Sequence, residues 1–294
     1  MITTQASEIG QLSAAAITEI IERATAGNPV AAYVEGEPLA WSVVQDGGWD
    51  LIGAPESEAG GDASLRDLVE VAQAWGRGCI PLPLLETLWV KRWSAAAREH
   101  GGPISVSVPR LGTTDGSGLA PFGSLPGVAV ARSVGSAVDV VDPAPSGSAE
   151  GFAQSLRSAI LPWTSEISSD AALELGVVWA AEAVGSAQLL LDLSVKYAKE
   201  REQFGKPIGS FQAVKHRLAD MHSQAQYAQT AVIWASLEPE NAIRASRYAL
   251  DTAIAVAESS IQVHGGMGFT WEVGLHFYLR SILTRRELVH GLWG

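Results

Sequence analysis

The sequence is short of cysteine and of basic residues, and each shortage excludes a class of function. Cys79 is the one cysteine among 294 residues, so no internal disulfide can form. Lysine and arginine together number 20 against 32 aspartates and glutamates, which gives a formal net charge of −12 at pH 7. That charge repels phosphate backbones and anionic lipid surfaces, so we expect no nucleic acid and no membrane among the partners.

Several familiar motifs are missing as well. The chain has no Gly-x-Gly-x-x-Gly after a predicted strand, no Gly-x-x-x-x-Gly-Lys-Ser/Thr and no Gly-x-Ser-x-Gly. The six histidines are scattered and no Cys/His cluster has zinc-ligand spacing, so no metal site is predicted. Cys79 is interpreted as a small buried hydrophobe and not as a nucleophile.

The start of the sequence shows no basic region before an apolar run, and no signal peptide is expected. The most apolar stretch, Ala171–Leu191, contains Glu174 and Glu182, so it is predicted to be a buried helix and not a membrane span. These features, with the absence of disulfides, predict a cytoplasmic protein.

The acidic charge is unevenly distributed. Residues 1–150 carry eight basic and eighteen acidic side chains, whereas residues 151–294 carry twelve and fourteen. An anionic ligand is therefore expected to prefer the second half of the chain.

The pattern of apolar residues predicts a mainly α protein with a small β domain. Residues 1–98 indicate a helical domain that includes a helix over Ser64–Trp75. Residues 99–165 indicate a reduced β-sheet domain, with short runs rich in valine at 104–108, 127–131 and 137–141.

Residues 166–294 show the spacing of a four-helix bundle. The first helix is predicted to be about 30 residues long. The second has Ser210 as its N-cap, the third begins after Pro239 and ends at Gly265, and the fourth covers about Glu272–Leu288.

Two segments of this half are rich in groups that bind anions. The first, Tyr197–His216, places the guanidinium of Arg201 near the first turn of the next helix, where Gln212 lies. A guanidinium and a helix N-terminus together suit a phosphate. The alternative interpretation is that cations stand there because they favour the end of a helix.

The second segment is Ile261–Glu272. Gly265 and Gly266 are able to end a helix in the left-handed conformation, which needs no ligand. A glycine pair followed by Gly268, with an amide at Gln262, also lets the backbone approach a flat or anionic ligand closely.

Together the two segments resemble the flavin-dependent acyl-CoA dehydrogenases. The motifs that carry the resemblance are Arg201-Glu-Gln-Phe-Gly205, Ser210-Phe-Gln-Ala213 and Gln262-Val-His-Gly-Gly266, with Gly48-Trp49 and Ala54-Pro-Glu56 in the first domain. The resemblance covers nearly the whole chain. It implies a helical domain, a small β domain and a four-helix bundle, assembled as a tetramer.

The resemblance implies FAD as the cofactor, bound between subunits. The resemblance implies that a neighbouring subunit holds the ring of this flavin. One set of residues in this chain is expected to contact the ADP portion of the same flavin. That set is Arg201, Gln212, Gln262, Val263, His264, Gly265 and Gly266.

Two departures from the family pattern affect the expected role. The β domain is about half the usual size and lacks a counterpart of the motifs that contact the flavin ring. The two family positions of the carboxylate base fall on Val289 and Leu175, neither of which accepts a proton. Glu287 and Glu174 lie two and one residues away, which turns a helical side chain by about 200° and 100°. We therefore assign no catalytic residue, and Glu272 is interpreted as an acid that favours the dipole of the last helix.

These departures resemble the truncated, non-catalytic subunit of heteromeric α2β2 acyl-CoA dehydrogenases, some of which act on CoA thioesters derived from steroids. The leading hypothesis is a subunit that completes the FAD site of a second, catalytic chain acting on an acyl-CoA. Two alternatives stay open. One is a self-sufficient dehydrogenase with Glu287 as a displaced base, and the other is a flavin-free scaffold on the same fold.

Overall fold

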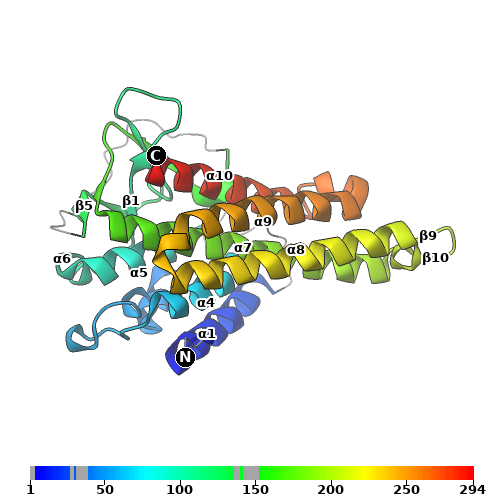
Figure 1. Ribbon diagram of the computed structural model, residues 1–294, viewed down its shortest axis with the longest axis horizontal. Helices are drawn as coiled ribbons and strands as arrows, with labels where there is room; N and C mark the ends of the chain where they lie inside the picture. Colours follow the sequence, from blue (N-terminus) through cyan, green and yellow to red (C-terminus); the bar gives the residue numbers. More distant parts are fainter. Residues whose placement is uncertain (1–3, 27–29, 31–38, 136–139, 142–151) are drawn as a thin grey trace.

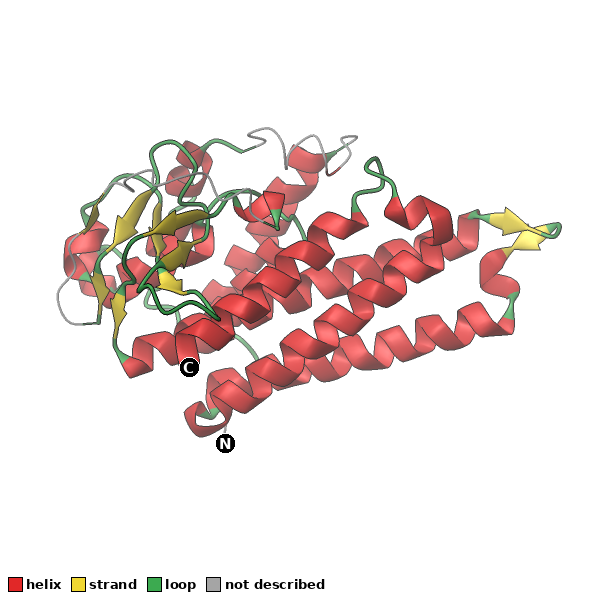
Figure 2. Cartoon of the chain, turned by 90° about the horizontal axis from the view of Figure 1, so that it is seen from above, coloured by secondary structure: helices red, strands yellow, loops and turns green. Residues whose placement is uncertain are grey.

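The computed structural model describes residues 4–26, 30, 39–135, 140–141 and 152–294. Four long helices form its largest part: α7 (Ser169–Glu200), α8 (Gln212–Leu237), α9 (Ala242–His264) and α10 (Leu275–Trp293). They run side by side with alternating direction, as Figures 1 and 2 show. The predicted fold class, mainly α with a small β part and a C-terminal bundle, is confirmed.

Small side chains allow the bundle helices to approach closely. Ala245, Ala249, Ala253 and Ala257 repeat every four residues along α9 and are buried, so they form one stripe of its core face. Some buried polar side chains also connect the helices, as where the Ser194 hydroxyl of α7 donates to the Ser260 hydroxyl of α9 at 2.8 Å.

Helix α7 is the core helix that the sequence predicted. Among the described residues it alone is long and apolar enough to cross a membrane, and 78% of its most apolar window is buried inside the protein. This burial is typical of a helix that packs within a protein core.

The N-terminal helices are α1 (Glu8–Thr25), α3 (Trp41–Asp46), α4 (Leu65–Gly76), α5 (Leu84–Trp93) and α6 (Ala95–Arg98), with 3-10 turns η1 (Trp49–Leu51) and η2 (Glu56–Glu58). The helix predicted at Ser64–Trp75 is confirmed as α4. Ser64 and Asp67 form a capping box at its start. A Cβ atom on Gly76 would lie 1.9 Å from the Glu182 carbonyl oxygen, and one on Gly185 would lie 2.0 Å from the Gln73 carbonyl oxygen, so reciprocal glycines let α4 pack directly on α7.

The described residues of the β region form short strands in three small sheets. They are β1 (Ile104–Val106), β4 (Ala129–Ala131) and β6 (Val140–Val141); β2 (Val108–Pro109), β3 (Gly118–Ala120) and β7 (Ala159–Leu161); and β5 (Ser133–Val134) with β8 (Glu166–Ile167). A 3-10 turn, η3 (Gln154–Leu156), precedes β7. The runs predicted at 104–108 and 127–131 contain strands. Of the run at 137–141, residues 137–139 lie outside the described residues.

Two helix boundaries differ from the prediction. Ser210 is not the N-cap of α8, because residues Ile208–Ser210 form a 3-10 turn, η4, and extended Phe211 precedes the helix without a side-chain cap. The last helix begins at Leu275 after Gly274 at φ 70°, and no acid stands in its first turn. Glu272 therefore lies outside α10, and the interpretation that it favours the dipole of this helix is wrong.

Candidate functional site

The elements that carry the anion-binding segments meet at one end of the bundle, which we call the hairpin end. It contains the last turn of α7, the hairpin of β9 (Glu202–Gln203) and β10 (Lys206–Pro207), the start of α8, the end of α9 and the turn η6 (Gly265–Phe269), as Figure 1 shows. The rings of Tyr197 and His264 stack with centroids 4.4 Å apart and fix the ends of α7 and α9 to each other.

The hairpin has a tight two-residue turn with unusual chemistry. Phe204 at φ 53° and Gly205 at φ 77° connect Gln203 to its cross-strand partner Lys206. Positive φ at both positions is the requirement of a type I′ turn, and a bulky residue rarely adopts it. The Phe204 ring is 91% exposed, so the turn presents an aromatic face to solvent. An exposed aromatic held in a rare backbone conformation is typical of a binding surface.

Arg201 and Gln212 flank this hairpin, and both are exposed. Arg201 ends α7, with its backbone N–H donating to the Tyr197 carbonyl and its carbonyl accepting from Ile208 N–H, each at 2.8 Å. Gln212 is the first residue of α8. No ion pair within the described part of the chain holds the Arg201 guanidinium, which leaves its donors to solvent or a ligand.

The segment 262–266 divides into groups that face outward and groups that face inward. Gln262 and Gly266 are exposed, and a Cβ atom on Gly266 would meet nothing within 4 Å. Gly265 has φ 59° but ψ −136°, so it reaches positive φ without the left-handed helical conformation of the interpretation that needs no ligand. Val263 packs against the core, and His264 is buried. The side chains of Val263 and His264 therefore do not face solvent together with Gln262 and Gly266.

The buried ring of His264 is held in its neutral form. Its Nδ1 lies 2.8 Å from the Ser260 carbonyl oxygen, which makes this nitrogen the donor in the neutral tautomer. Burial lowers the pKa of His264 below its ordinary value, and the bond to the carbonyl opposes that shift only in part. His264 therefore supports the hairpin end from inside.

Gly268 differs from the glycine pair before it. A Cβ atom there would lie 2.5 Å from the Ile261 carbonyl oxygen, so Gly268 is required by packing. Beside it lies an exposed apolar group that sequence reasoning did not single out. Its members are Met267, Phe269 and Trp271, which are 48%, 74% and 42% exposed. Such a cluster marks a surface that another molecule covers.

The two positions expected for a catalytic base lie in a different environment. Leu175 on α7 and Val289 on α10 are both 0% exposed. The end of α10 packs over the start of α7 there, because the Trp293 Nε1–H donates to the Ala172 carbonyl at 3.1 Å and a Cβ atom on Gly176 would lie 2.0 Å from the Trp293 ring. Both positions are thus part of an apolar packing layer.

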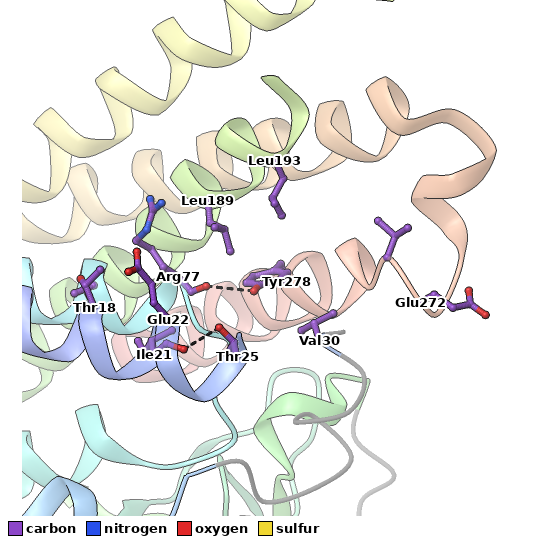
Figure 3. Close-up of a pocket in the computed structure, with 12 residues that line it drawn as sticks. Thr18, Ile21, Glu22, Thr25, Val30, Arg77, Leu189, Leu193, Glu272 and Tyr278 are labelled. Atoms are coloured by element: carbon purple, nitrogen blue, oxygen red, sulfur yellow. Dashed lines mark hydrogen bonds between the residues drawn. The ribbon is translucent and has the colours of Figure 1, made fainter. Parts of the chain in front are cut away.

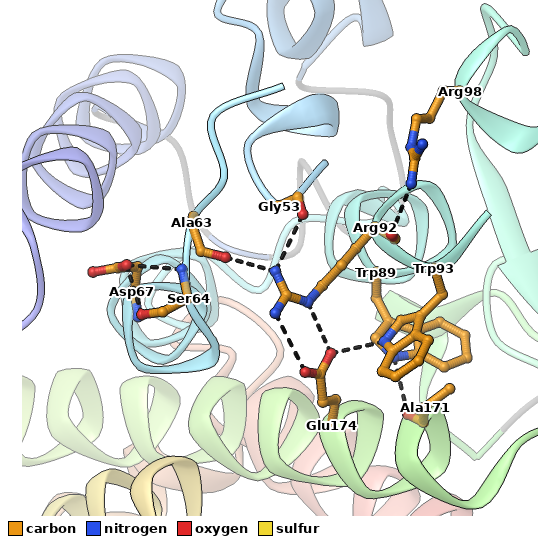
Figure 4. Close-up of polar contacts among 10 residues, drawn as sticks. All are labelled: Gly53, Ala63, Ser64, Asp67, Trp89, Arg92, Trp93, Arg98, Ala171 and Glu174. Atoms are coloured by element: carbon orange, nitrogen blue, oxygen red, sulfur yellow. Dashed lines mark hydrogen bonds and ion pairs between the residues drawn. The ribbon is translucent and has the colours of Figure 1, made fainter. Parts of the chain in front are cut away.

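Glu174, the neighbour of Leu175, is bound by other side chains. Its Oε2 accepts from Arg92 Nε at 2.9 Å and from Trp93 Nε1 at 2.7 Å, as Figure 4 shows. The same Arg92 donates to the carbonyls of Gly53 and Ala63 at 3.1 and 2.6 Å. Glu174 therefore anchors the first domain to α7.

A buried cluster of charged side chains lies next to this layer, between α5, α7 and α10. Arg285 is 2.6 Å from Glu86 and 2.7 Å from Glu182, and the Trp179 Nε1–H donates to Glu86 at 2.8 Å. Burial raises the pKa of Glu182, although Arg285 opposes this shift. Burial alone would lower the pKa of Arg285, but the two carboxylates raise it.

Cys79 lies beside this cluster, and burial raises the pKa of its thiol to about 12. A thiol with that pKa is not a nucleophile at neutral pH, which confirms the interpretation of Cys79 as a buried hydrophobe. The described residues include no group of three or more His, Cys, Asp or Glu side chains placed to hold a metal ion.

Glu272 and Glu287 lie at the surface. Figure 3 shows Glu272 at the edge of a cavity of about 320 Å³ between α1, α7 and α10, with its carboxylate turned away from the cavity. The Glu287 side chain is 51% exposed, 3.3 Å from Arg286, and lines a cleft between α10 and the sheet of β2, β3 and β7.

Comparison with known proteins decides the family. Residues 177–288 match the family described as "Acyl-CoA dehydrogenase, C-terminal domain". The acyl-CoA dehydrogenase IpdE2 of Mycobacterium tuberculosis is 33% identical over 80% of this chain and 77% of its own length. The chain belongs to the acyl-CoA dehydrogenase family.

A second relative, the acyl-CoA dehydrogenase FadE34 of Mycobacterium tuberculosis, is 34% identical over 89% of this chain. The chain spans only 41% of the length of FadE34. Members of the acyl-CoA dehydrogenase family are oxidoreductases that act on CH–CH bonds, and FAD is the cofactor typical of the family.

Two solved structures share the acyl-CoA dehydrogenase fold with this chain. The ChsE4–ChsE5 complex from Mycobacterium tuberculosis superposes with a TM-score of 0.76 at 20% identity, over 100% of this chain and 96% of that one. The Tcur3481–Tcur3483 steroid acyl-CoA dehydrogenase gives 0.73 at 20% identity, over 95% and 91%. At this identity the likeness shows the fold alone.

Proposed function

We propose that this chain is a non-catalytic subunit that completes the FAD site of a second, catalytic acyl-CoA dehydrogenase chain. One contrast carries the proposal. The hairpin end presents Arg201, Gln212 and the open backbone at Gly266 to solvent, whereas Leu175 and Val289, the expected base positions, are fully buried and apolar. The chain thus offers groups for a cofactor and none for proton abstraction at the two expected base positions.

Each exposed group has a separate task toward the ADP portion of FAD. Arg201 supplies a planar guanidinium for the pyrophosphate, and Gln212 adds a side-chain amide at the N-terminus of α8. Gly265 and Gly266 admit a close approach of the ligand to the backbone, with Gln262 beside them, and Phe204 covers the site from the hairpin. Bound FAD supplies the acceptor of the β-hydride, and the partner chain supplies the base.

The proposal includes a partner and a substrate class. Of the two solved structures with this fold, one is a complex, ChsE4–ChsE5, and the other is a steroid enzyme, Tcur3481–Tcur3483. We propose an α2β2 heterotetramer in the cytoplasm that introduces an α,β double bond into an acyl-CoA whose acyl group derives from a steroid.

Co-expression tests the proposal directly. The chain alone is expected to purify with little FAD, and the complex with its partner to be yellow and to oxidise an acyl-CoA. Stoichiometric FAD and activity in the chain alone would refute the proposal, and a complex without flavin absorbance would favour the scaffold alternative.

We expect Arg201→Ala to weaken FAD retention in the complex about tenfold or more, because a charge-assisted hydrogen bond contributes about 1.5–3 kcal/mol. Arg244→Ala is the matched control, since Arg244 is exposed at the opposite end of α9. Equal FAD retention in the two variants would remove the role assigned to Arg201.

One observation keeps a second candidate function: Glu287 is half-exposed and lines a cleft, as a displaced base would. If the chain is self-sufficient, Glu287→Gln abolishes turnover while the fold stays intact. Undiminished turnover excludes this alternative.

A further inference from the structure

The buried charged groups between α5, α7 and α10 do not balance one another. Glu86 and Glu182 are two carboxyl groups, and Arg285 is the one cation that pairs with them among the described residues. The side chains of Glu86 and Arg285 are 1% exposed, and that of Glu182 is 10% exposed. If both carboxyl groups were ionised, the cluster would keep one unbalanced negative charge away from water, which is strongly unfavourable. One proton on either carboxyl group makes the cluster neutral.

Hydrogen bonds distinguish the two carboxyl groups. Glu86 Oε1 accepts from Arg285 Nη1 at 2.6 Å and from Trp179 Nε1 at 2.8 Å. Glu182 Oε2 lies 2.7 Å from Arg285 Nε, but both atoms are buried and neither makes a hydrogen bond within the described part of the chain. Hydrogen bonds to a carboxylate favour its ionised form. This geometry therefore favours Glu86 as the carboxylate and leaves Glu182 to carry the proton.

The described surroundings of Glu182 contain no second cation. Cys79 lies beside it, and burial raises the pKa of that thiol to about 12, so the thiol is uncharged at neutral pH. The β region contributes the Phe122 ring, 5.6 Å from the Arg285 guanidinium. Burial raises the pKa of Glu182, Arg285 opposes this shift, and the charge of Glu86 adds to it. Arg285 of α10 and Glu86 of α5 are thus the charged groups that face Glu182 in the described structure.

We propose that Glu182 is a neutral carboxylic acid at neutral pH, and that its ionisation at higher pH is a switch that loosens the junction of the three parts of the chain. Glu86 belongs to the first domain, Glu182 and Arg285 belong to the bundle, and Phe122 packs on Arg285 from the β region. When Glu182 loses its proton to solvent, a second negative charge stands beside Glu86, and the packing of α5 on α7 and α10 weakens. This proposal goes beyond the function proposed above and does not rest on it, because neither FAD nor a partner chain takes part.

The sign of the pH dependence follows from the two states of the chain. In the unfolded chain the pKa of Glu182 keeps its ordinary value of 4.5, whereas burial raises it in the folded chain. The stability that this group contributes is therefore complete below pH 4.5 and is lost as the pH rises through the higher folded pKa.

Infrared spectroscopy of the full chain detects the proton directly. A protonated carboxyl group shows a C=O stretch that a carboxylate lacks, and carboxyl groups with an ordinary pKa are ionised at pH 7. The parent chain is expected to show this band at pH 7, and Glu182→Gln is expected to lack it. Glu258→Gln, at an exposed position of α9, is the matched control and should keep the band. Absence of the band from the parent, or its persistence in Glu182→Gln, would overturn the proposal.

Urea unfolding separates the roles of the two carboxyl groups. Glutamine is an uncharged substitute for a protonated glutamate, so Glu182→Gln is expected to be at least as stable as the parent at pH 7. Glu86→Gln is expected to be less stable, because it removes the carboxylate that Arg285 and Trp179 bind. From pH 5 to pH 8 the parent should lose stability relative to Glu182→Gln. A loss at pH 7 as large for Glu182→Gln as for Glu86→Gln would show that both groups are ionised and would refute the proposal.

Discussion

The hairpin end and the α7–α10 packing layer lie at different places along helix α7 and differ in what they expose. At the hairpin end, Arg201, Gln212 and the Phe204 ring face solvent, and backbone conformations that favour glycine recur. In the packing layer, Leu175 and Val289 are fully buried, and the adjacent charges pair with one another. One region keeps free donors for a ligand, whereas the other has the contacts of a protein core. Substitutions in the two regions should therefore affect different properties.

The largest effect is expected from Arg285→Met. This change leaves Glu86 and Glu182 buried without their cation, and removing one member of a buried ion pair costs about 3–5 kcal/mol of stability. Urea unfolding of the chain measures the loss. Arg286→Met is the control, because it is the same change at the next position, where the side chain is 31% exposed and weakly paired. A similar loss in both variants would show that the buried cluster adds no particular stability.

A smaller effect is expected from Glu174→Gln. The change removes the charge that Arg92 and Trp93 bind, and hydrogen bonds to a charged group contribute about 1.5–3 kcal/mol. Glu258→Gln, at an exposed position of α9, is expected to change the free energy of unfolding by less than about 0.5 kcal/mol.

The activity of the Glu174→Gln complex sharpens the comparison. If Glu174 only anchors the first domain, the complex keeps its turnover and its FAD. Loss of turnover at unchanged stability would instead make Glu174 the base and would contradict the assignment of this region to packing.

Most of the fold was predictable because its long helices repeat one apolar pattern over many turns. The four bundle helices and the helix after Ser64 follow from that spacing alone. The start of α8 was not predictable in this way. Ser210 has the chemistry of an N-cap but lies in a 3-10 turn that follows Pro207. A local preference for capping does not reveal such a turn.

The site was predictable only where its residues lie close together in the sequence. The segments around Arg201 and Gly265 indicated a ligand, although the inward direction of His264 depends on its stacking with Tyr197, a residue of another helix. The buried cluster gave no signal, because Glu86 and Arg285 are 199 residues apart. The cleft beside Glu287 was not predictable either. Its wall includes Leu119 and Ile160, which are paired across two strands, and the sequence of neither strand reveals that pairing.

The smallest effect is expected from His264→Phe, which tests whether the hairpin end depends on a neutral ring. Burial lowers the pKa of His264 in the folded chain, whereas in the unfolded chain the pKa keeps its ordinary value of 6.5. The resulting stability is complete above pH 6.5 and is lost as the pH falls from 6.5 through the lower folded pKa, because the unfolded chain binds the proton first. Phenylalanine keeps the ring on Tyr197 but does not titrate. Urea unfolding at pH 7.5 and 5.5 should show a smaller loss of stability for the variant than for the parent. Burial also lowers the pKa of His276, so this residue contributes separately to the pH dependence of stability. His276→Phe is therefore the control. If His264→Phe and the parent lose equal stability between the two pH values, the hairpin end does not depend on the protonation state of His264.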